Sequence, residues 1–243
     1  MKFFSWILML GMSIVIIAAF IVPGAKSFQQ PELARIIFFH VPCAIIGSLF
    51  YFGAGWFGFK YIKSKKEHWA IRCGACLEMS CLLAALTLVT GMLFSRVQWG
   101  AWWQWDPRQT SYLMTFFMLL AALSLKTSIK DPQKQASAIS SYALISLVPV
   151  IFLIFIFPRL PHLIQTSFHP SQTLLKGELD LSYSWILRGM ALILFAFCTL
   201  IFQGRVKVEL LEKQLEDLED DRNMESTSNH STITSVDNTI SLS

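Results

Sequence analysis

Six long apolar segments constrain this chain more than any other feature. They run over residues 3–22, 36–59, 73–95, 112–129, 136–157 and 183–203. A helix rises about 1.5 Å per residue and a hydrocarbon core is about 30 Å thick, so each segment can span a membrane, although the fourth is short. Only 15% of the residues are charged, against about 25% in soluble domains. We therefore expect an all-α integral membrane protein with six transmembrane helices.

The distribution of basic residues predicts the orientation of these helices. With a cytoplasmic N-terminus, 13 lysines and arginines lie inside and 7 outside, as the positive-inside rule requires. The dense cluster from Lys60 to Arg72 carries most weight. We expect a multi-pass protein of the cell inner (plasma) membrane with both termini in the cytoplasm. The net charge of +4 is no signal of a nucleic-acid partner.

The chain changes character after Arg205. Four apolar residues recur at 3-4-3 spacing among acidic ones, which indicates a short amphipathic helix; they are Val208, Leu211, Leu215 and Leu218. After Asn223 the chain is rich in Ser, Thr and Asn, a composition typical of disorder. The expected domains are therefore a six-helix membrane domain at 1–205 and a cytoplasmic helix with a disordered tail at 206–243.

The pair Cys73 and Cys76 has the spacing of a redox or metal motif. It lies at the start of an apolar segment, without a second pair and without the following histidine that covalent haem attachment requires. A buried cysteine usually behaves as a small hydrophobic residue. Packing is therefore the favoured interpretation, and redox or metal chemistry is the alternative.

A tryptophan-rich stretch, WGAWWQWDPRQT, occupies residues 99–110 and holds four of the chain's eight tryptophans. An aromatic belt at a membrane surface explains one or two of them. We expect Trp99, Trp102 and Trp103 to share one helical face, with Trp105 beside it. Such a surface suits a large planar ligand with apolar faces and a charged edge. The alternative is a membrane anchor.

Directly after the tryptophans, Asp106 and Pro107 have the composition of a turn. Arg108 follows, and its guanidinium can bind a carboxylate through two parallel hydrogen bonds. It can equally pair with Asp106, and the sequence leaves both interpretations open.

Histidines stand in two of the expected outer regions. Pro42 fits the first turn of the second helix, so His40 is expected just before that helix, as a metal ligand or as a polar residue at a wet interface. His162 and His169 lie in the last outer loop. Two outer histidines can supply both axial positions of a haem iron. Three outer arginines are candidates for a haem propionate: Arg35, Arg108 and Arg159.

The stretch WGAWWQWDPRQTS at 99–111 closely resembles the WWD signature of haem-handling membrane proteins, in the form found in the CcmC family. The segment RIIFFHVP at 35–42 is similar to the His-Val-Pro segment of that family. Leu-Val-Thr-Gly at 88–91, Asp131-Pro132 and His169-Pro170 follow in the expected order. The resemblance covers about residues 31–175.

The resemblance implies that haem b binds on the outer face and is presented to a periplasmic haem chaperone (CcmE-like) for cytochrome c maturation. The implied partners also include ABC-transporter subunits (CcmA/CcmB-like) and the lipid bilayer. The implied axial ligands are His40 and His169, with His162 as the alternative to His169. The other implied binding residues are Trp99, Trp102, Trp103, Trp105, Asp106 and Arg108.

Two other functions remain open. A CcsA-like haem lyase or exporter subunit would attach or move haem itself, and the Asp106-Pro107 pair resembles that branch, whereas the Arg108-Gln-Thr-Ser ending and the short chain do not. A transport channel would need ionisable groups inside its helices, where only Glu78 and Arg188 are candidates. We identify no nucleophile–base pair in the outer loops, so no catalytic residue is assigned and an enzyme is not expected.

Overall fold

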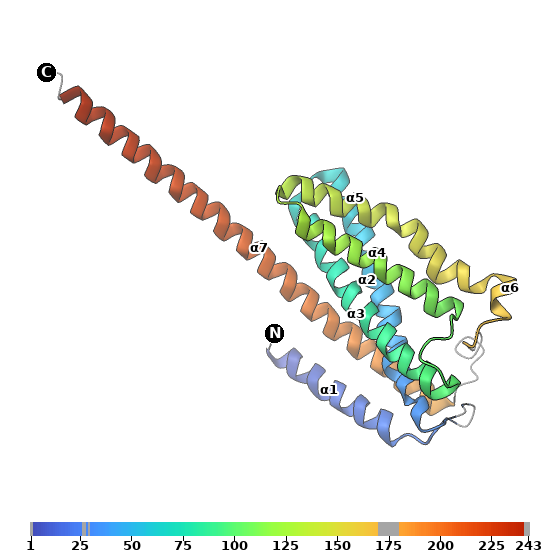
Figure 1. Ribbon diagram of the computed structural model, residues 1–243. Helices are drawn as coiled ribbons and strands as arrows, with labels where there is room; N and C mark the ends of the chain where they lie inside the picture. Colours follow the sequence, from blue (N-terminus) through green and yellow to red (C-terminus); the bar gives the residue numbers. More distant parts are fainter. Residues whose placement is uncertain (1, 26–27, 29, 170–179, 241–243) are drawn as a thin grey trace. The chain divides into compact units, whose positions relative to one another are not determined.

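The computed structural model describes residues 2–25, 28, 30–169 and 180–240, and all regular structure in them is helical (Figure 1). Contacts divide the chain into two units, residues 1–202 and 203–243. The elements are α1 (Lys2–Ile21), η1 (Leu33–Ile36), α2 (Ile37–Ser64), α3 (Glu67–Trp99), α4 (Pro107–Ser128), α5 (Pro132–Ile151), η2 (Phe152–Ile156), η3 (Phe157–Arg159), α6 (Pro161–Ile164) and α7 (Leu181–Ile240). Pro170 and residues 241–243, named in the expectations above, lie outside the described residues.

Five helical stretches are long and apolar enough to cross a membrane. They are Leu33–Ser64, Glu67–Trp99, Pro107–Ser128, Pro132–Arg159 and Leu181–Met224. A shorter apolar helix covers Ser5–Ile21. The predicted all-α class and multi-pass membrane character are confirmed. That the shorter helix also crosses the membrane, which would make six spans, stays a prediction.

The second helix begins earlier than its sequence suggests. The helical chain starts at Leu33 as a 3-10 turn and continues into α2, so Pro42 lies inside the helix. The prediction that Pro42 starts the helix and that His40 precedes it is therefore wrong. The physical reason is that a proline inside a helix loses the bond to the carbonyl four residues back, here that of Phe38, a loss that transmembrane helices tolerate because neighbouring groups can satisfy the freed carbonyl.

A glycine and two hydroxyl groups bring α2 and α5 together. A Cβ added at Gly58 would lie 2.6 Å from the Ser140 carbonyl oxygen, so the backbones of α2 and α5 approach as closely as glycine permits. Further along α2, the Tyr51 hydroxyl donates to Ser146 Oγ at 2.8 Å. These contacts hold α2, which lines the site described below, against α5.

α4 and α5 each begin with an Asp-Pro dipeptide. Asp106 caps α4 by accepting from the Arg108 N–H at 2.8 Å, and Pro107 is the first helical residue. Asp131 caps α5 in the same way, with Pro132 following. Reading Asp106-Pro107 as a turn is therefore wrong, because aspartate favours the N-cap and proline the first helical position.

The second unit, residues 203–243, consists of the later part of α7. Its apolar stripe is exposed; the stripe residues are Val208, Leu211, Leu215 and Leu218. The helical backbone continues to Ile240, where the composition after Asn223 predicts disorder. Residues 205–243 contain neither glycine nor proline, so no local signal ends the helix. The cytoplasmic location of this region and a boundary at 205/206 stay predictions.

Candidate functional site

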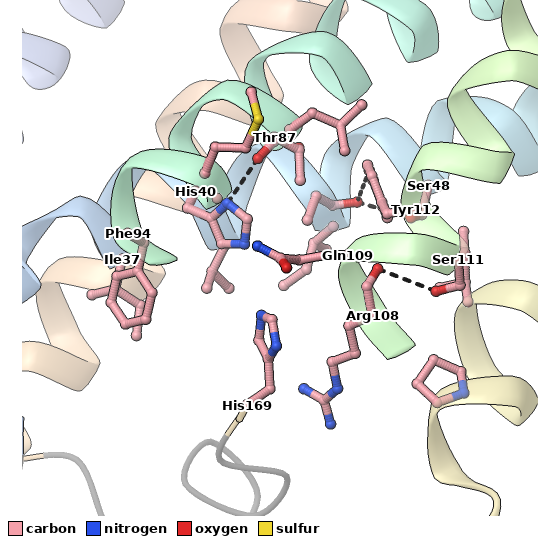
Figure 2. Close-up of a pocket in the computed structure, with 18 of the residues that line it drawn as sticks. Ile37, His40, Ser48, Thr87, Phe94, Arg108, Gln109, Ser111, Tyr112 and His169 are labelled. Carbon is pink, nitrogen blue, oxygen red and sulfur yellow. Dashed lines mark hydrogen bonds between the residues drawn. The ribbon is translucent and has the colours of Figure 1, made fainter. Parts of the chain in front are cut away.

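A cavity of about 400 Å³ lies among α2, α3, α4 and η2, and the loops after α3 and after α6 contribute to it (Figure 2). Its walls are mainly apolar, as is usual for small-molecule sites; examples are Ile37, Val41, Leu88, Met92 and Ile154. A few polar groups interrupt this lining, namely His40, Arg108, Gln109, Tyr112, Arg159 and His169. The two histidines that the sequence singles out therefore line the same cavity.

His40 lies on α2 and is held against α3. Its Nδ1 is 3.1 Å from the Thr87 carbonyl oxygen and 3.1 Å from Thr90 Oγ1. A carbonyl only accepts, so Nδ1 donates to Thr87 and the lone pair is on Nε2. A Cβ at Gly91 would lie 2.9 Å from His40 Cε1, so only glycine leaves room for the ring here. This role of Thr87, Thr90 and Gly91 could not be predicted from the sequence pattern, although Leu-Val-Thr-Gly belongs to the resemblance.

His169, in the loop after α6, is held by Asp106 at the start of α4. His169 Nδ1 is 2.9 Å from Asp106 Oδ1. The other carboxylate oxygen of Asp106 accepts from Ser167 Oγ at 2.8 Å and from the Phe168 N–H at 2.7 Å. Burial alone would raise the pKa of Asp106, which is 1% exposed, but the bonds from His169, the Arg108 N–H and Ser167 hold that pKa well below its usual range.

This arrangement suits a metal that brings other ligands with it. Each ring is held at Nδ1, which orients Nε2 as the ligating nitrogen, a common second-sphere arrangement around metals. Among residues 2–25, 28, 30–169 and 180–240, no three His, Cys, Asp or Glu side chains cluster as a metal site. Two histidines alone would hold a metal weakly, whereas haem iron already has four porphyrin nitrogens and takes axial histidines. The donors present therefore fit haem.

Two of the three candidate arginines line the cavity. Arg108 and Arg159 do so, the latter from η3. In the part of the chain that the structure describes, the Arg108 guanidinium makes no ion pair with Asp106, which binds the Arg108 backbone instead. Arg35 does not line the cavity, because it donates to the Val22 carbonyl at 2.7 Å and pairs with Glu32 at 2.5 Å.

The four tryptophans of the motif have three different environments. Trp99 packs edge-on against the His169 ring, with centroids 5.0 Å apart, and Trp103 lines the cavity. Trp102 and Trp105 are 55% and 77% exposed. α3 ends at Trp99 because Gly100 adopts φ +85°, so the prediction of one shared helical face is wrong.

Two buried donors face the same cavity. Gln109 is 8% exposed, and neither its Nε2 nor Trp103 Nε1 has a hydrogen-bond partner in the described structure. Buried donors without partners are rare, and they often mark a place where a ligand or water binds. Gln109 was not among the residues predicted from sequence, although it directly follows Arg108. Figure 2 shows the Gln109 amide between the two imidazoles.

Other candidates from the sequence lie elsewhere. His162 is exposed on α6 and does not line the cavity. Cys73 and Cys76 are buried, free thiols on α3, in agreement with packing. Glu78 forms an ion pair with Lys126 at 2.7 Å between α3 and α4.

The family model and several curated relatives that match this chain carry the same description. The model of the family CcmC, described as heme exporter protein C, matches residues 1–220. Heme exporter protein C of Haemophilus influenzae is 30% identical over 158 residues, which are 61% of this chain and 60% of that protein. The Paracoccus denitrificans protein of the same name is 26% identical over 111 residues, 46% of each chain.

The Escherichia coli K12 heme exporter protein C is 28% identical over 121 residues, 50% of this chain and 49% of the relative. Thus the chain spans about half the length of most of the curated relatives it matches. The family model, in contrast, covers nearly all of the membrane helices and both loops of the cavity. This chain belongs to the CcmC family, the heme exporter protein C family.

Proposed function

We propose that this protein binds haem b on the outer (periplasmic) face of the inner membrane and presents it for cytochrome c maturation. One observation carries the proposal: His40 and His169 line one apolar cavity, and each is held at Nδ1. The relatives' printed name, heme exporter protein C, supports haem as the ligand.

We assign the axial positions of the haem iron to Nε2 of His40 and of His169. Arg108 and Arg159 would meet the propionates, because both line the cavity. Trp103 would contact the ring, and Trp99 would position His169 through their ring contact. Asp106 holds His169 and does not itself touch the haem.

Trp102 and Trp105 have a different role from Trp99 and Trp103. Trp105 packs edge-on against Trp103, which lines the cavity, with ring centroids 5.9 Å apart. Both Trp102 and Trp105 are largely exposed. We propose that they cover the edge of the haem that projects beyond the cavity.

The proposed topology has six membrane helices, with the tryptophan-rich loop outside and both termini in the cytoplasm. It is supported by the basic clusters at Lys60–Arg72 and Lys126–Lys134, which follow the ends of α2 and α4 remote from the cavity. In this scheme residues 1–205 bind haem, and residues 206–243 take no part in binding it.

The proposed acceptor is a CcmE-like haem chaperone, and the proposed complex includes CcmA- and CcmB-like transporter subunits. The alternative is a CcsA-like haem lyase or exporter subunit, which the Asp106-Pro107 pair favours. Copurification separates the two, because a presenting protein would retain the haem chaperone and a lyase would retain apocytochrome.

The test of the haem site is the absorption spectrum of the detergent-purified protein after incubation with haem. We expect a Soret band in the wild type and its loss or shift in His40→Ala and in His169→Ala. His162→Ala is the matched control, because His162 is exposed and outside the cavity.

Unchanged spectra in both His40→Ala and His169→Ala would refute the axial assignment. A larger effect of His162→Ala than of His169→Ala would show that the wrong histidine of this loop is assigned. The amount of each variant in the membrane fraction serves as the folding control.

A further inference from the structure

One wall of the cavity is also part of the surface of the membrane unit. Ile45, Leu49 and Phe52 lie along one face of α2 and line the cavity. Ile45 and Leu49 are nevertheless 51% and 48% exposed. Both belong to the apolar span Leu33–Ser64, whose outer surface would contact lipid in a membrane. Side chains that line a cavity and are half exposed form its rim.

The opposite rim comes from η2. Ile154 and Phe155 line the cavity, and Phe155 is 44% exposed within the span Pro132–Arg159. The Phe155 ring stacks on Phe52, with centroids 6.0 Å apart and an interplanar angle of 25°. Between the described residues of α2 and η2 this is the single ring contact, and no hydrogen bond joins them. The junction between the two elements is therefore apolar, with no polar bond to hold its rims together in the described residues.

The local helix geometry changes at this junction. α2 and α5 are held together by the bond from Tyr51 to Ser146, three residues before Pro149. After Pro149 the helix changes to the π-form at Phe152–Ile156, a rare geometry that is frequent at functional sites. Beyond this change the cavity lies between α2 and η2, which meet at the Phe52–Phe155 stack.

We infer that the opening between α2 and η2 is a lateral entrance through which haem reaches the cavity from the bilayer. The inference rests on the proposed function. Haem is a flat apolar ring with an anionic edge, and the entrance matches both properties. Apolar residues form its two rims, and Arg159 follows η2 at one of them, where it donates to the Phe155 carbonyl at 2.8 Å. A guanidinium so placed can meet a propionate that stays near the membrane surface.

The test blocks the entrance reversibly. The five native cysteines are buried, so Leu49→Cys provides an accessible thiol that a bulky methanethiosulfonate reagent can modify. Leu82→Cys is the matched control, because Leu82 is 54% exposed on α3 and does not line the cavity. Haem is loaded into the lipid of proteoliposomes, and the growth of the Soret band is followed in time.

We expect modified Leu49→Cys to load about tenfold more slowly than the unmodified variant, whatever haem content is finally reached. Reduction of the mixed disulfide should restore the rate, which excludes misfolding as the cause. The modified Leu82→Cys variant should load like the wild type.

Equal loading rates of modified and unmodified Leu49→Cys would overturn the lateral entrance. A lower final amplitude at an unchanged rate would also overturn it, because the reagent would then fill part of the cavity without obstructing the way into it. A wild-type protein without any Soret band would instead refute the proposed function, and the entrance with it.

Discussion

Asp106 and Asp131 precede prolines at the starts of α4 and α5, and both accept backbone N–H groups of the first helical turn. Their surroundings differ. The Asp131 side chain is 47% exposed, and its polar partners are the N–H groups of Gln133 and Lys134 and the Lys134 ammonium at 3.6 Å. Asp106 is 1% exposed, and three of its four bonds come from residues 167–169.

The difference teaches how a common helix start becomes part of a site. At Asp131 both carboxylate oxygens serve partners within three residues along the chain. At Asp106 one local bond satisfies the cap, and the remaining acceptor capacity holds a distant loop with His169 in it. The local motif is the same, but the loop that folds over it differs.

Replacing each aspartate by alanine should give the largest difference between the two sites. Asp106→Ala leaves the donors of Ser167, Phe168 and His169 without their acceptor, at a cost of about 2–3 kcal/mol. We expect a large loss of haem retention and a lower melting temperature, measured by Soret absorbance and thermal unfolding in detergent. Asp131→Ala should leave the haem spectrum unchanged. Equal effects of the two variants would show that Asp106 is only a helix cap.

A smaller effect should follow from replacing each carboxylate by the amide, since asparagine caps helices well. Asp131→Asn should be silent. Asp106→Asn keeps the cap but weakens the hold on His169, and removal of such second-sphere partners lowers metal affinity by about 10–100-fold. Haem titration of the two variants measures this difference. Wild-type affinity in Asp106→Asn would contradict a positioning role for the charge.

The lowered pKa of Asp106 predicts that the stability of the protein depends on pH. Because the folded pKa of Asp106 is lowered, its stabilising contribution is complete above the unfolded pKa of about 3.9 and is lost as the pH falls through the folded value. The difference in melting temperature between the wild type and Asp106→Asn should therefore be constant near neutral pH and shrink below about pH 4. A constant difference down to about pH 3 would mean that the carboxylate charge is irrelevant.

The smallest effect should come from replacing a single side chain that binds one of the two aspartates. Ser167→Ala removes one of the bonds to Asp106, worth about 1 kcal/mol, and should only slightly weaken haem retention. Lys134→Ala removes an exposed ion pair, which contributes little. Haem dissociation rates of the two variants should differ by less than those of the aspartate variants.

Much of the fold could be predicted from sequence because it depends on short-range patterns. Apolar runs predict membrane helices, and five observed spans and a shorter apolar helix correspond to the six predicted segments. The start of α2 could not be placed, because a 3-10 turn from Leu33 precedes it. The shared face of the tryptophans failed for a similar reason, since Gly100 ends α3.

The sequence by itself determined the apolar helices and the motifs that lead to the CcmC family, whereas the structure showed that both Asp-Pro pairs cap helices. Hydropathy and motif spacing are properties of neighbouring residues, so no three-dimensional information is needed to see them. Only the tertiary structure decided that His40 and His169 line one cavity, that Thr87 and Asp106 hold their Nδ1 atoms, and that Arg35 lies elsewhere. The physical reason is that these contacts join residues far apart in the chain, and side-chain packing between helices decides which of them meet.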